Sequence, residues 1–320
     1  MKMRTGSIKE HEPPLHGIIL GELGHGKTTL CAQATHFSEC VWAITDPNTL
    51  PTLMALGIDV EYDTFVDTSL SQPTAFNRLV DFIDTTLSRW AEAGELNSSK
   101  TFVLDGITGL LPIAMNRALV LKGLTPKNTG KGRAKIDTKA GDPLGYYKTN
   151  DEGLVSLRSI SDLGDYNVMG AMVKHLLTHL AIQTCNVFVT AHIVRENDKA
   201  GHLVEDICTN KALKQEIPSR FTEAWVVRAE DVMREGELTT VRTIDTRPSV
   251  SRYARTAYEH ILDRREKAYL PYLRDKIIAG MKQETGNTVN KFDPGDIEID
   301  QNVNFLVNAG QKAQWAVKEK

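Results

Sequence analysis

Four residues at fixed spacing carry the clearest chemical signal in this sequence. Gly21, Gly26, Lys27 and Thr28 fit the pattern G-x-x-x-x-G-K-[ST], within the stretch GELGHGKTTL. An apolar run, residues 15–20, precedes the pattern, and a stretch typical of a helix, TTLCAQATHF, follows it. Strand, glycine loop and helix in this order predict a loop whose backbone N–H groups surround phosphate oxygens at a helix N-terminus.

Such a loop is expected to bind ATP together with Mg²⁺. The Lys27 ammonium would reach the β- and γ-phosphates, and the Thr28 hydroxyl would ligate Mg²⁺. The residues expected to line the nucleotide are Gly21, Glu22, Leu23, Gly24, His25, Gly26, Lys27, Thr28 and Thr29. The alternative is an ordinary glycine-rich turn between a strand and a helix.

Two carboxylates follow predicted strands. Asp105 ends the apolar run TFVLD, the pattern of a Walker B aspartate that holds Mg²⁺ directly or through water. Many motor-type ATPases place a catalytic Glu immediately after this Asp, but here the residue is Gly106. Asp46, which follows the predicted strand 40–45, is therefore the candidate to activate water. The alternatives are a strand-capping Asp105 and an Asp46 that only initiates a turn before Pro47.

These stretches resemble the RecA-like recombinases, and among them the phage-encoded ATPases of single-strand annealing and recombination. The resemblance is carried by GELGHGKTT, VWAITDP, LDGITGL, the Asp-Tyr start of the predicted helix at 165–184, and VFVTAHI. They span roughly residues 15–230. The resemblance implies an α/β fold, a RecA-like P-loop NTPase core with a mainly parallel sheet and helices on both faces.

The resemblance also implies roles for single residues. It places Asp46 where an acidic residue, more usually Glu, polarises the attacking water. His192 takes the place of a polar residue, often Gln, that senses the γ-phosphate; a purely structural histidine is the alternative. The sequence departs from the family at Gly106, where Ser is usual, and in its long insert at 124–150.

The pattern of apolar residues predicts the remaining organisation. We expect helices over 73–93, 166–184 and 251–280, a buried strand over 186–192, and an antiparallel pair formed by EAWVVRAEDVM and ELTTVRTID. Residues 193–217 show no clear periodicity. The predicted domains are a polar arm at 1–14, a RecA-like ATPase core at 15–245 with a basic insert at 123–150, and a C-terminal helical segment with a polar tail at 246–320.

Charge is distributed unevenly over the 320 residues. The net charge is −3, yet residues 117–148 hold eight Lys or Arg and two Asp, a local charge of +6, so the remainder carries −9. A basic segment on an acidic body is a candidate nucleic-acid contact, and a solvated loop is the commoner explanation. The sequence has no apolar run of membrane-spanning length, and its first residues do not have the apolar core of a signal peptide. We therefore expect a cytoplasmic protein, in the host cytoplasm if phage-encoded, with no membrane partner.

The basic insert is the predicted contact for single-stranded DNA. Its expected DNA-binding residues are Lys127, Lys131, Arg133 and Lys135. Tyr146 and Tyr147 would stack on bases or anchor the loop. By its position in RecA-like proteins, 193–217 is a second DNA loop, but its five basic and five acidic residues between 195 and 220 make that role weaker.

RecA-like ATPases are completed by a cation from the neighbouring subunit, which implies a homo-oligomer, either filament or ring. Arg255 is the selected candidate, with Arg247 and Arg252 as alternatives, and each could instead belong to a solvated helix face. A single-strand DNA-binding protein is a further candidate partner.

The function predicted from these features is slow, DNA-stimulated hydrolysis of ATP by a protein that assembles on single-stranded DNA and promotes annealing or recombination. The alternatives are a ring-forming helicase or a DNA-packaging motor. A small-molecule kinase is a third alternative, but the sequence lacks an evident Arg-rich lid.

Overall fold

A computed structural model of the chain describes residues 12–68, 73–124, 147–150, 153–156, 163–197, 203–209, 211–214, 216–234, 237–249 and 254–288. The chain divides into two compact units, residues 1–279 and 280–320. The fold described below belongs to the first unit.

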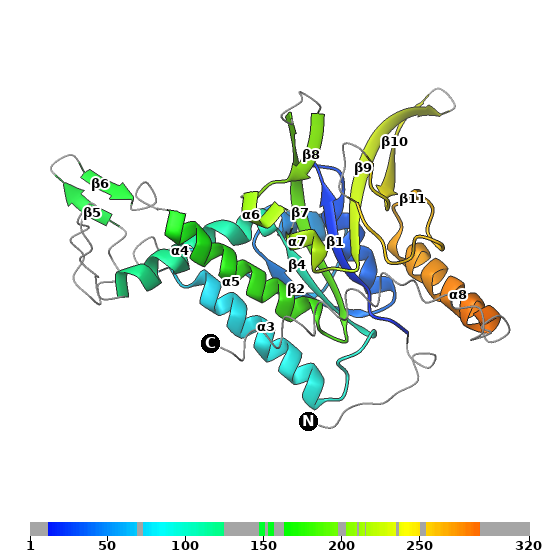
Figure 1. Cartoon of the computed structure of the whole chain (residues 1–320), viewed down its shortest axis with the longest axis horizontal. Helices are drawn as coiled ribbons and strands as arrows, with labels where there is room; N and C mark the ends of the chain where they lie inside the picture. Colours follow the sequence, from blue (N-terminus) through cyan, green and yellow to red (C-terminus); the bar gives the residue numbers. More distant parts are fainter. Residues whose placement is uncertain are drawn as a thin grey trace, which may run out of the picture. The chain divides into compact units, whose positions relative to one another are not determined.

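A nine-stranded sheet forms the centre of this unit (Figure 1). Its strand order is β11-β10-β9-β1-β7-β4-β2-β3, with β8 paired to β7. Six strands from β9 to β3 run parallel to their neighbours, whereas β8, β10 and β11 are antiparallel additions. The strands are β1 (His16–Gly21), β2 (Glu39–Ile44), β3 (Glu61–Thr64), β4 (Lys100–Asp105), β7 (Asn186–Asn197), β8 (Leu203–Ile207), β9 (Glu223–Arg234), β10 (Glu237–Asp245) and β11 (Arg265–Lys267). β5 (Tyr147–Asn150) and β6 (Gly153–Ser156) form a separate antiparallel pair.

Helices connect the parallel strands. They are α1 (Lys27–Ala32), the 3₁₀ helix η2 (Gln33–His36), α2 (Thr49–Ala55), α3 (Ala75–Glu92), α4 (Ile107–Leu124), α5 (Leu163–Ala181), α6 (Lys211–Lys214) and α7 (Glu216–Ser219). A further helix, α8 (Leu270–Thr288), follows the last strand, β11. A tight turn cannot join two parallel strands, because the chain must first return to the end of the sheet where the previous strand began. The helices provide this return. The predicted helices at 73–93 and 166–184 correspond to α3 and α5.

The central strands are mainly apolar, as expected for a sheet with helices on both faces. In β1, Ile18 and Leu20 belong to a core that also holds Leu79 of α3, Ile113 of α4 and Leu177 of α5. Ile19 points to the opposite face, since side chains alternate along a strand, and α1 contacts β1 and β7 there. The predicted α/β class, a mainly parallel sheet with helices on both faces, is confirmed.

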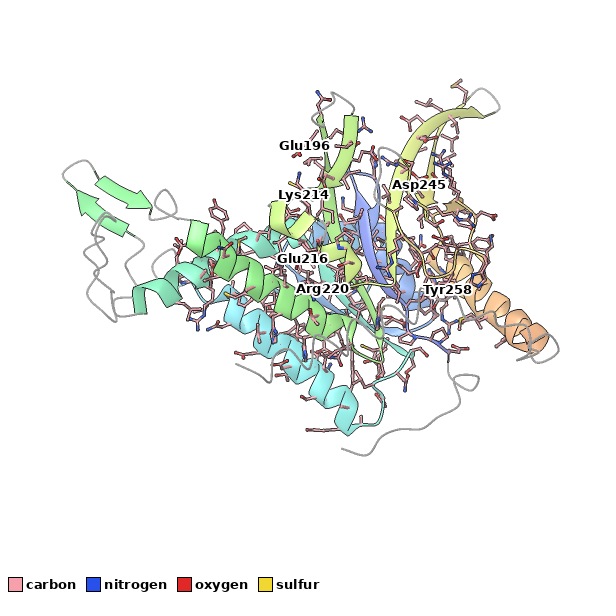
Figure 2. The ribbon with its side chains drawn as sticks, in the orientation of Figure 1. Glu196, Lys214, Glu216, Arg220, Asp245 and Tyr258 are labelled. Atoms are coloured by element: carbon pink, nitrogen blue, oxygen red, sulfur yellow. The ribbon has the colours of Figure 1, made fainter. Side chains whose placement is uncertain are left out.

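Two sequence predictions were wrong in this region. The helix expected over 251–280 begins only at Leu270, and the strand β11 lies within the stretch before it. The strand expected to end at His192 continues to Asn197 and pairs with β8, so much of the supposedly irregular segment 193–217 is a β-hairpin followed by two short helices. Lys214 of α6 binds Glu196 of β7 at 2.7 Å and Asp206 of β8 at 3.2 Å (Figure 2). The charges of this segment thus largely neutralise one another.

Both neighbours of β1 extend beyond its end. Gly21, the last residue of β1, is paired with His192, five residues before the end of β7. On the other side, Leu20 pairs with Val226 of β9, which runs on to Arg234 and turns back into β10. The loop after β1 therefore lies between two long hairpins, β7–β8 and β9–β10 (Figure 1).

Candidate nucleotide site

The glycine loop turns sharply between β1 and α1. Gly24 and Gly26 have φ angles of 79° and 92°, a backbone conformation that residues with a side chain rarely adopt. The ring nitrogen Nδ1 of His25 lies 3.3 Å from the carbonyl oxygen of Val227, which attaches the loop to β9. Leu23, at the tip, is 76% exposed. Gly26, a fixed position of the motif, and Gly24 thus allow the backbone path that an anion-binding loop needs.

Lys27 is buried at the start of α1, and its ammonium points back into the loop. Nζ donates to the carbonyl oxygens of Gly21 at 3.0 Å and Glu22 at 2.9 Å. Burial lowers the pKa of Lys27, and the carboxylates of Asp105 and Asp46 act in the opposite direction. The cation is held where the β- and γ-phosphates of a bound nucleotide are expected.

Asp105 ends β4 beside the loop and accepts hydrogen bonds from three hydroxyl groups. Thr28 donates to Oδ2 at 2.9 Å, Thr49 donates to the same oxygen at 2.6 Å, and Thr190 donates to Oδ1. Asp105 is only 2% exposed. The structure thus brings the two predicted metal-binding residues, Thr28 and Asp105, into direct contact.

This donor set fits Mg²⁺. In the described residues, no group of three or more His, Cys, Asp or Glu side chains is arranged to hold a metal ion. Mg²⁺ bound with a nucleotide does not need such a group, because phosphate oxygens and water fill most of its octahedral sphere. A hydroxyl oxygen from Thr28 and a carboxylate from Asp105 are the hard oxygen ligands that remain for the protein to supply.

Asp46 and His192 meet above the lysine. His192 Nδ1 lies 3.1 Å from Lys27 Nζ, and its Nε2 lies 3.4 Å from Asp46 Oδ2. An ammonium can only donate, so Nδ1 accepts and the ring hydrogen of the neutral imidazole is on Nε2, facing Asp46. Burial and the Lys27 cation lower the pKa of His192, whereas its contact with Asp46 acts to raise it.

The other oxygen of Asp46 is occupied locally. Oδ1 accepts from the backbone N–H of Asn48 at 2.9 Å and from its side-chain Nδ2 at 3.1 Å. This is the turn-forming role that the sequence also allowed before Pro47. The same residue therefore forms the turn and presents Oδ2 to the site.

The position after Asp105 requires a glycine, Gly106, because Asp46 lies very close to its backbone. Its φ is +112°, and a Cβ atom there would lie 2.9 Å from the Cβ atom of Asp46 and 2.9 Å from Oγ1 of Thr45. Thr45 Oγ1 also donates to the Gly106 carbonyl oxygen at 2.5 Å. No side chain fits at the position after Asp105, because the Cβ atom of Asp46 and Oγ1 of Thr45 take up the space.

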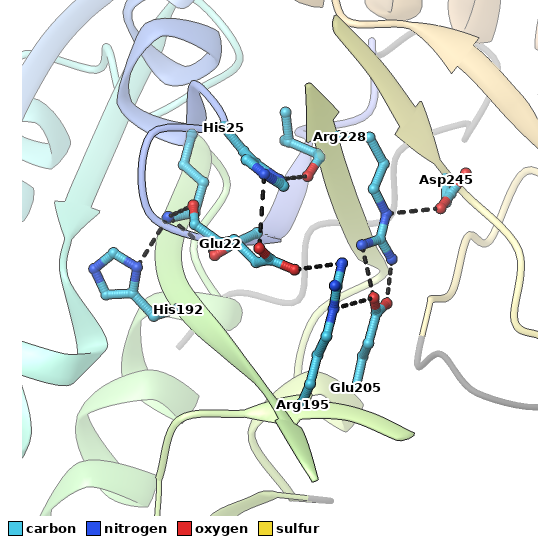
Figure 3. A network of polar contacts seen from close by, with 10 residues as sticks. Glu22, His25, His192, Arg195, Glu205, Arg228 and Asp245 are labelled. Atoms are coloured by element: carbon cyan, nitrogen blue, oxygen red, sulfur yellow. Dashed lines mark hydrogen bonds and ion pairs between the residues drawn. The ribbon is translucent and has the colours of Figure 1, made fainter. Parts of the chain in front are cut away.

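A network of ion pairs joins the loop to both hairpins (Figure 3). Glu22 of the loop pairs with Arg195 of β7 at 2.6 Å, and Arg195 lies 3.5 Å from Glu205 of β8. Glu205 accepts from Arg228 of β9 at 2.8 Å, and Arg228 Nε donates to Asp245 of β10 at 3.2 Å. Because Arg228 and Asp245 are each only 5% exposed, removing Arg228 would take a shared cation away from the carboxylates of Glu205 and Asp245.

Other predicted site residues lie apart from this cluster. Arg255 forms a β-bridge with Ala224, near the start of β9, so within its own chain it is at the opposite end of the sheet from the phosphate loop. Arg247 donates to the carbonyl oxygen of Leu262 at 2.8 Å. The predicted DNA-binding residues and two of the other candidates lie outside the described residues: Lys127, Lys131, Arg133, Lys135, Tyr146 and Arg252.

Sequence reasoning missed the hydroxyl groups around Asp105. Thr190 pairs directly with Asp105 in the register of β7 and β4, and Thr49 begins α2. The available signal was a threonine two residues before His192, near the carboxyl end of the strand predicted over 186–192.

No protein-family model matches the sequence, and no curated protein matches it. Among solved structures, one with a similar fold is a KaiC-like protein from the hyperthermophilic archaeon Pyrococcus horikoshii. It is 12% identical, the match covers 76% of this chain and 80% of that chain, and the TM-score is 0.35. The chain has an α/β fold with a mainly parallel sheet, and its phosphate-loop motif lies between β1 and α1. Within the described residues, none of the helices combines the length and hydrophobicity needed to cross a membrane.

Proposed function

We propose that this chain is an ATPase that binds ATP with Mg²⁺, hydrolyses it, and acts on single-stranded DNA as a homo-oligomer. The observation that carries the ATPase proposal is the 2.9 Å contact between Thr28 Oγ1 and Asp105 Oδ2, beside the inward-pointing ammonium of Lys27. A hydroxyl and a cation from the start of α1 and a carboxylate from the end of β4 converge at one edge of the sheet, where a nucleoside triphosphate is expected to bind.

Each residue then has a defined task. Mg²⁺ would neutralise charge on the β- and γ-phosphate oxygens, held through Thr28 and Asp105. Lys27 would exchange its carbonyl partners in the loop for phosphate oxygens. Asp46 would accept a proton from the attacking water at Oδ2, the oxygen that its turn leaves available.

His192 has a positioning role in this proposal. Its Nε2–H faces Asp46 Oδ2 at 3.4 Å and orients that carboxylate. When Lys27 turns to the phosphates, Nδ1 of His192 loses its 3.1 Å partner and becomes free to respond to the γ-phosphate. His192 lies in β7, the strand that continues into the β7–β8 hairpin, so a change at the imidazole has a direct path to that hairpin.

Lys27→Ala tests the ATPase proposal. The variant should lose hydrolysis and bind ATP much more weakly, because it removes the cation between the β- and γ-phosphates. Lys267→Ala removes the same charge from β11 and is the matched control. Undiminished hydrolysis by Lys27→Ala would refute the assignment of the loop.

The DNA-binding part rests on the charge of the insert, +6 within residues 117–148. ATP hydrolysis should be measured with and without single-stranded DNA, alongside electron microscopy of the assembly. Stimulation by DNA and annealing of complementary strands would support the proposal. Rapid hydrolysis with duplex unwinding would instead select a ring helicase, and a protein that neither binds DNA nor assembles would refute this part.

A further inference from the structure

Arg242 lies against the phosphate loop from the β10 side. A Cβ atom built on Gly26 would lie 2.9 Å from Arg242 Nε, 3.0 Å from its Cδ and 3.9 Å from its Cζ. The guanidinium therefore covers Gly26, the residue immediately before Lys27, while the Arg242 side chain stays exposed to solvent. This contact joins residues far apart in sequence, because β10 reaches the loop only by pairing with β9 next to β1.

The charge of Arg242 is unmatched within the part of the chain that the structure describes. Arg228 of β9 and Arg265 of β11 both donate to the carboxylate of Asp245, at 3.2 Å and 3.1 Å. Arg228 pairs with Thr243 and Arg265 with Asp245, so Arg242 projects from the opposite face of β10. No hydrogen bond or ion pair from its guanidinium to a described residue is found. An exposed, unpaired guanidinium beside an anion-binding loop is suited to an anionic ligand.

The position of Arg242 relative to the catalytic cluster indicates which part of the ligand it reaches. Asp105, Asp46 and His192 come from β4, β2 and β7, all on one side of β1. Arg242 comes from β10, on the other side of β1, beyond β9. A triphosphate whose γ end lies at Asp46 and His192 must cross the loop, so its α-phosphate end faces the β9–β10 hairpin.

We propose that Arg242 is a nucleotide-binding residue that contacts the α-phosphate end of the bound nucleotide. The inference rests on the proposed function, since it requires the loop to bind a nucleotide. A guanidinium presents several N–H donors in a rigid plane that matches phosphate oxygens. Because ATP and ADP share the α-phosphate, Arg242 strengthens the binding of both, whereas Asp46 acts only when a γ-phosphate is present.

The experiment compares ATP and ADP affinities of the full chain with those of Arg242→Ala and Arg242→Lys, by calorimetry with Mg²⁺ present. Loss of a charge-assisted hydrogen bond should weaken both nucleotides by roughly 10- to 100-fold in Arg242→Ala. Arg242→Lys should lose less, because a lysine keeps the charge but not the planar donors.

Lys267→Ala is the control. Lys267 pairs with Thr243, the neighbour of Arg242, so its side chain projects from the opposite face of the same sheet edge. It should leave both affinities unchanged. If wild type and Arg242→Ala bind nucleotides equally well, the inference about Arg242 is wrong, but the proposed function is not affected. A loss of affinity for ATP only would also overturn the inference, because it would place the contact at the γ-phosphate. A wild-type chain that binds neither nucleotide would overturn the inference and the proposed function together.

Discussion

His192 Nε2 lies 3.4 Å from Asp46 Oδ2, so a residue inside β7 meets the turn that follows β2, above the lysine of the phosphate loop. The other ring nitrogen of His192, Nδ1, lies 3.1 Å from Lys27 Nζ. Lys27, His192 and Asp46 thus form a continuous polar chain from the phosphate cradle to the proposed base. The arrangement predicts that a change at Lys27 or at Asp46 alters the protonation equilibrium of His192.

Replacing Asp46 should separate hydrolysis from binding. Asp46→Asn should leave ATP affinity largely intact and reduce the turnover number by roughly 10²- to 10⁴-fold, the usual cost of losing an activating base. Asp105→Asn should instead weaken Mg²⁺-dependent binding, because Asp105 accepts from Thr28 and two other hydroxyls. Calorimetry and single-turnover assays distinguish the two. Normal hydrolysis by Asp46→Asn would show that the base lies elsewhere.

The pKa of His192 should respond in opposite directions to its two neighbours. In the wild-type protein it should lie below 6.5, because burial and Lys27 both disfavour the imidazolium. Lys27→Ala removes a nearby cation and should raise this pKa, whereas Asp46→Asn removes a carboxylate and should lower it further. NMR titration of the ring protons measures both shifts.

His16 is an internal control for that titration. Its pKa is also lowered by burial, but its Nε2 is bonded to the carbonyl oxygen of Cys185, at the amino end of the sheet. Neither variant should move it. An unchanged His192 pKa in Lys27→Ala would contradict the contact between the two side chains.

The sequence alone predicted those site residues that belong to a motif within one continuous stretch of the chain. The glycine loop predicted Lys27 and Thr28, and the apolar run before Asp105 predicted the strand that delivers it. A parallel sheet brings the carboxyl ends of such strands to one edge, so the contact between Thr28 and Asp105 follows from the fold class.

Features that depend on pairing between distant segments could not be predicted in the same way. Arg265 and Glu266 look like part of a charged helix, yet Arg265 binds Asp245 across the sheet and Glu266 is buried. The end of β7 is polar on both faces because it leaves the core, so residues such as Arg195 lack the alternation that marks a strand. Arg242 is one arginine among many until β9 and β10 are paired.

Glu223 should make stability depend on pH. This buried carboxylate accepts from Trp225 Nε1 at 2.9 Å and from the backbone N–H of Ala257 at 3.0 Å, near Arg255 and Tyr258. Burial raises its pKa to about 7, more than these partners lower it. Above pH 4.5, the ordinary pKa of this side chain, the folded chain holds more protons than the unfolded chain. Its free energy of unfolding should therefore fall as pH rises from 4.5 to 7, by up to about 3 kcal/mol.

Glu223→Gln removes this titration, so the stability difference between wild type and variant should change between pH 5 and pH 8. The absolute stability of Glu223→Gln is not informative, because an amide has only one acceptor oxygen and cannot accept from both Trp225 and Ala257 as the two carboxylate oxygens do. Urea unfolding at a series of pH values measures the difference, with Glu92→Gln, an exposed residue at the end of α3, as the control. A difference that stays constant with pH would show that Glu223 is ionised throughout.

The basic insert should determine how DNA binding depends on salt. Each phosphate neutralised on a single strand steepens the dependence of log K on log salt by roughly 0.7. Replacing Lys127, Lys131, Arg133 and Lys135 with Ala should therefore flatten the slope by up to about 3 per protomer. DNA binding at moderate salt should weaken while ATP affinity is unchanged, because none of the four belongs to the phosphate-loop motif.

A second variant separates charge from loop structure in that experiment. Replacing Thr125, Asn128, Thr129 and Thr138 with Ala changes the same number of residues in the same segment without changing its charge, and should leave the slope as in the wild type. Fluorescence anisotropy with a labelled oligonucleotide at several salt concentrations gives the slopes. If the quadruple basic variant assembles normally and its slope is unchanged, the insert is a solvated loop and the DNA surface lies elsewhere on the chain.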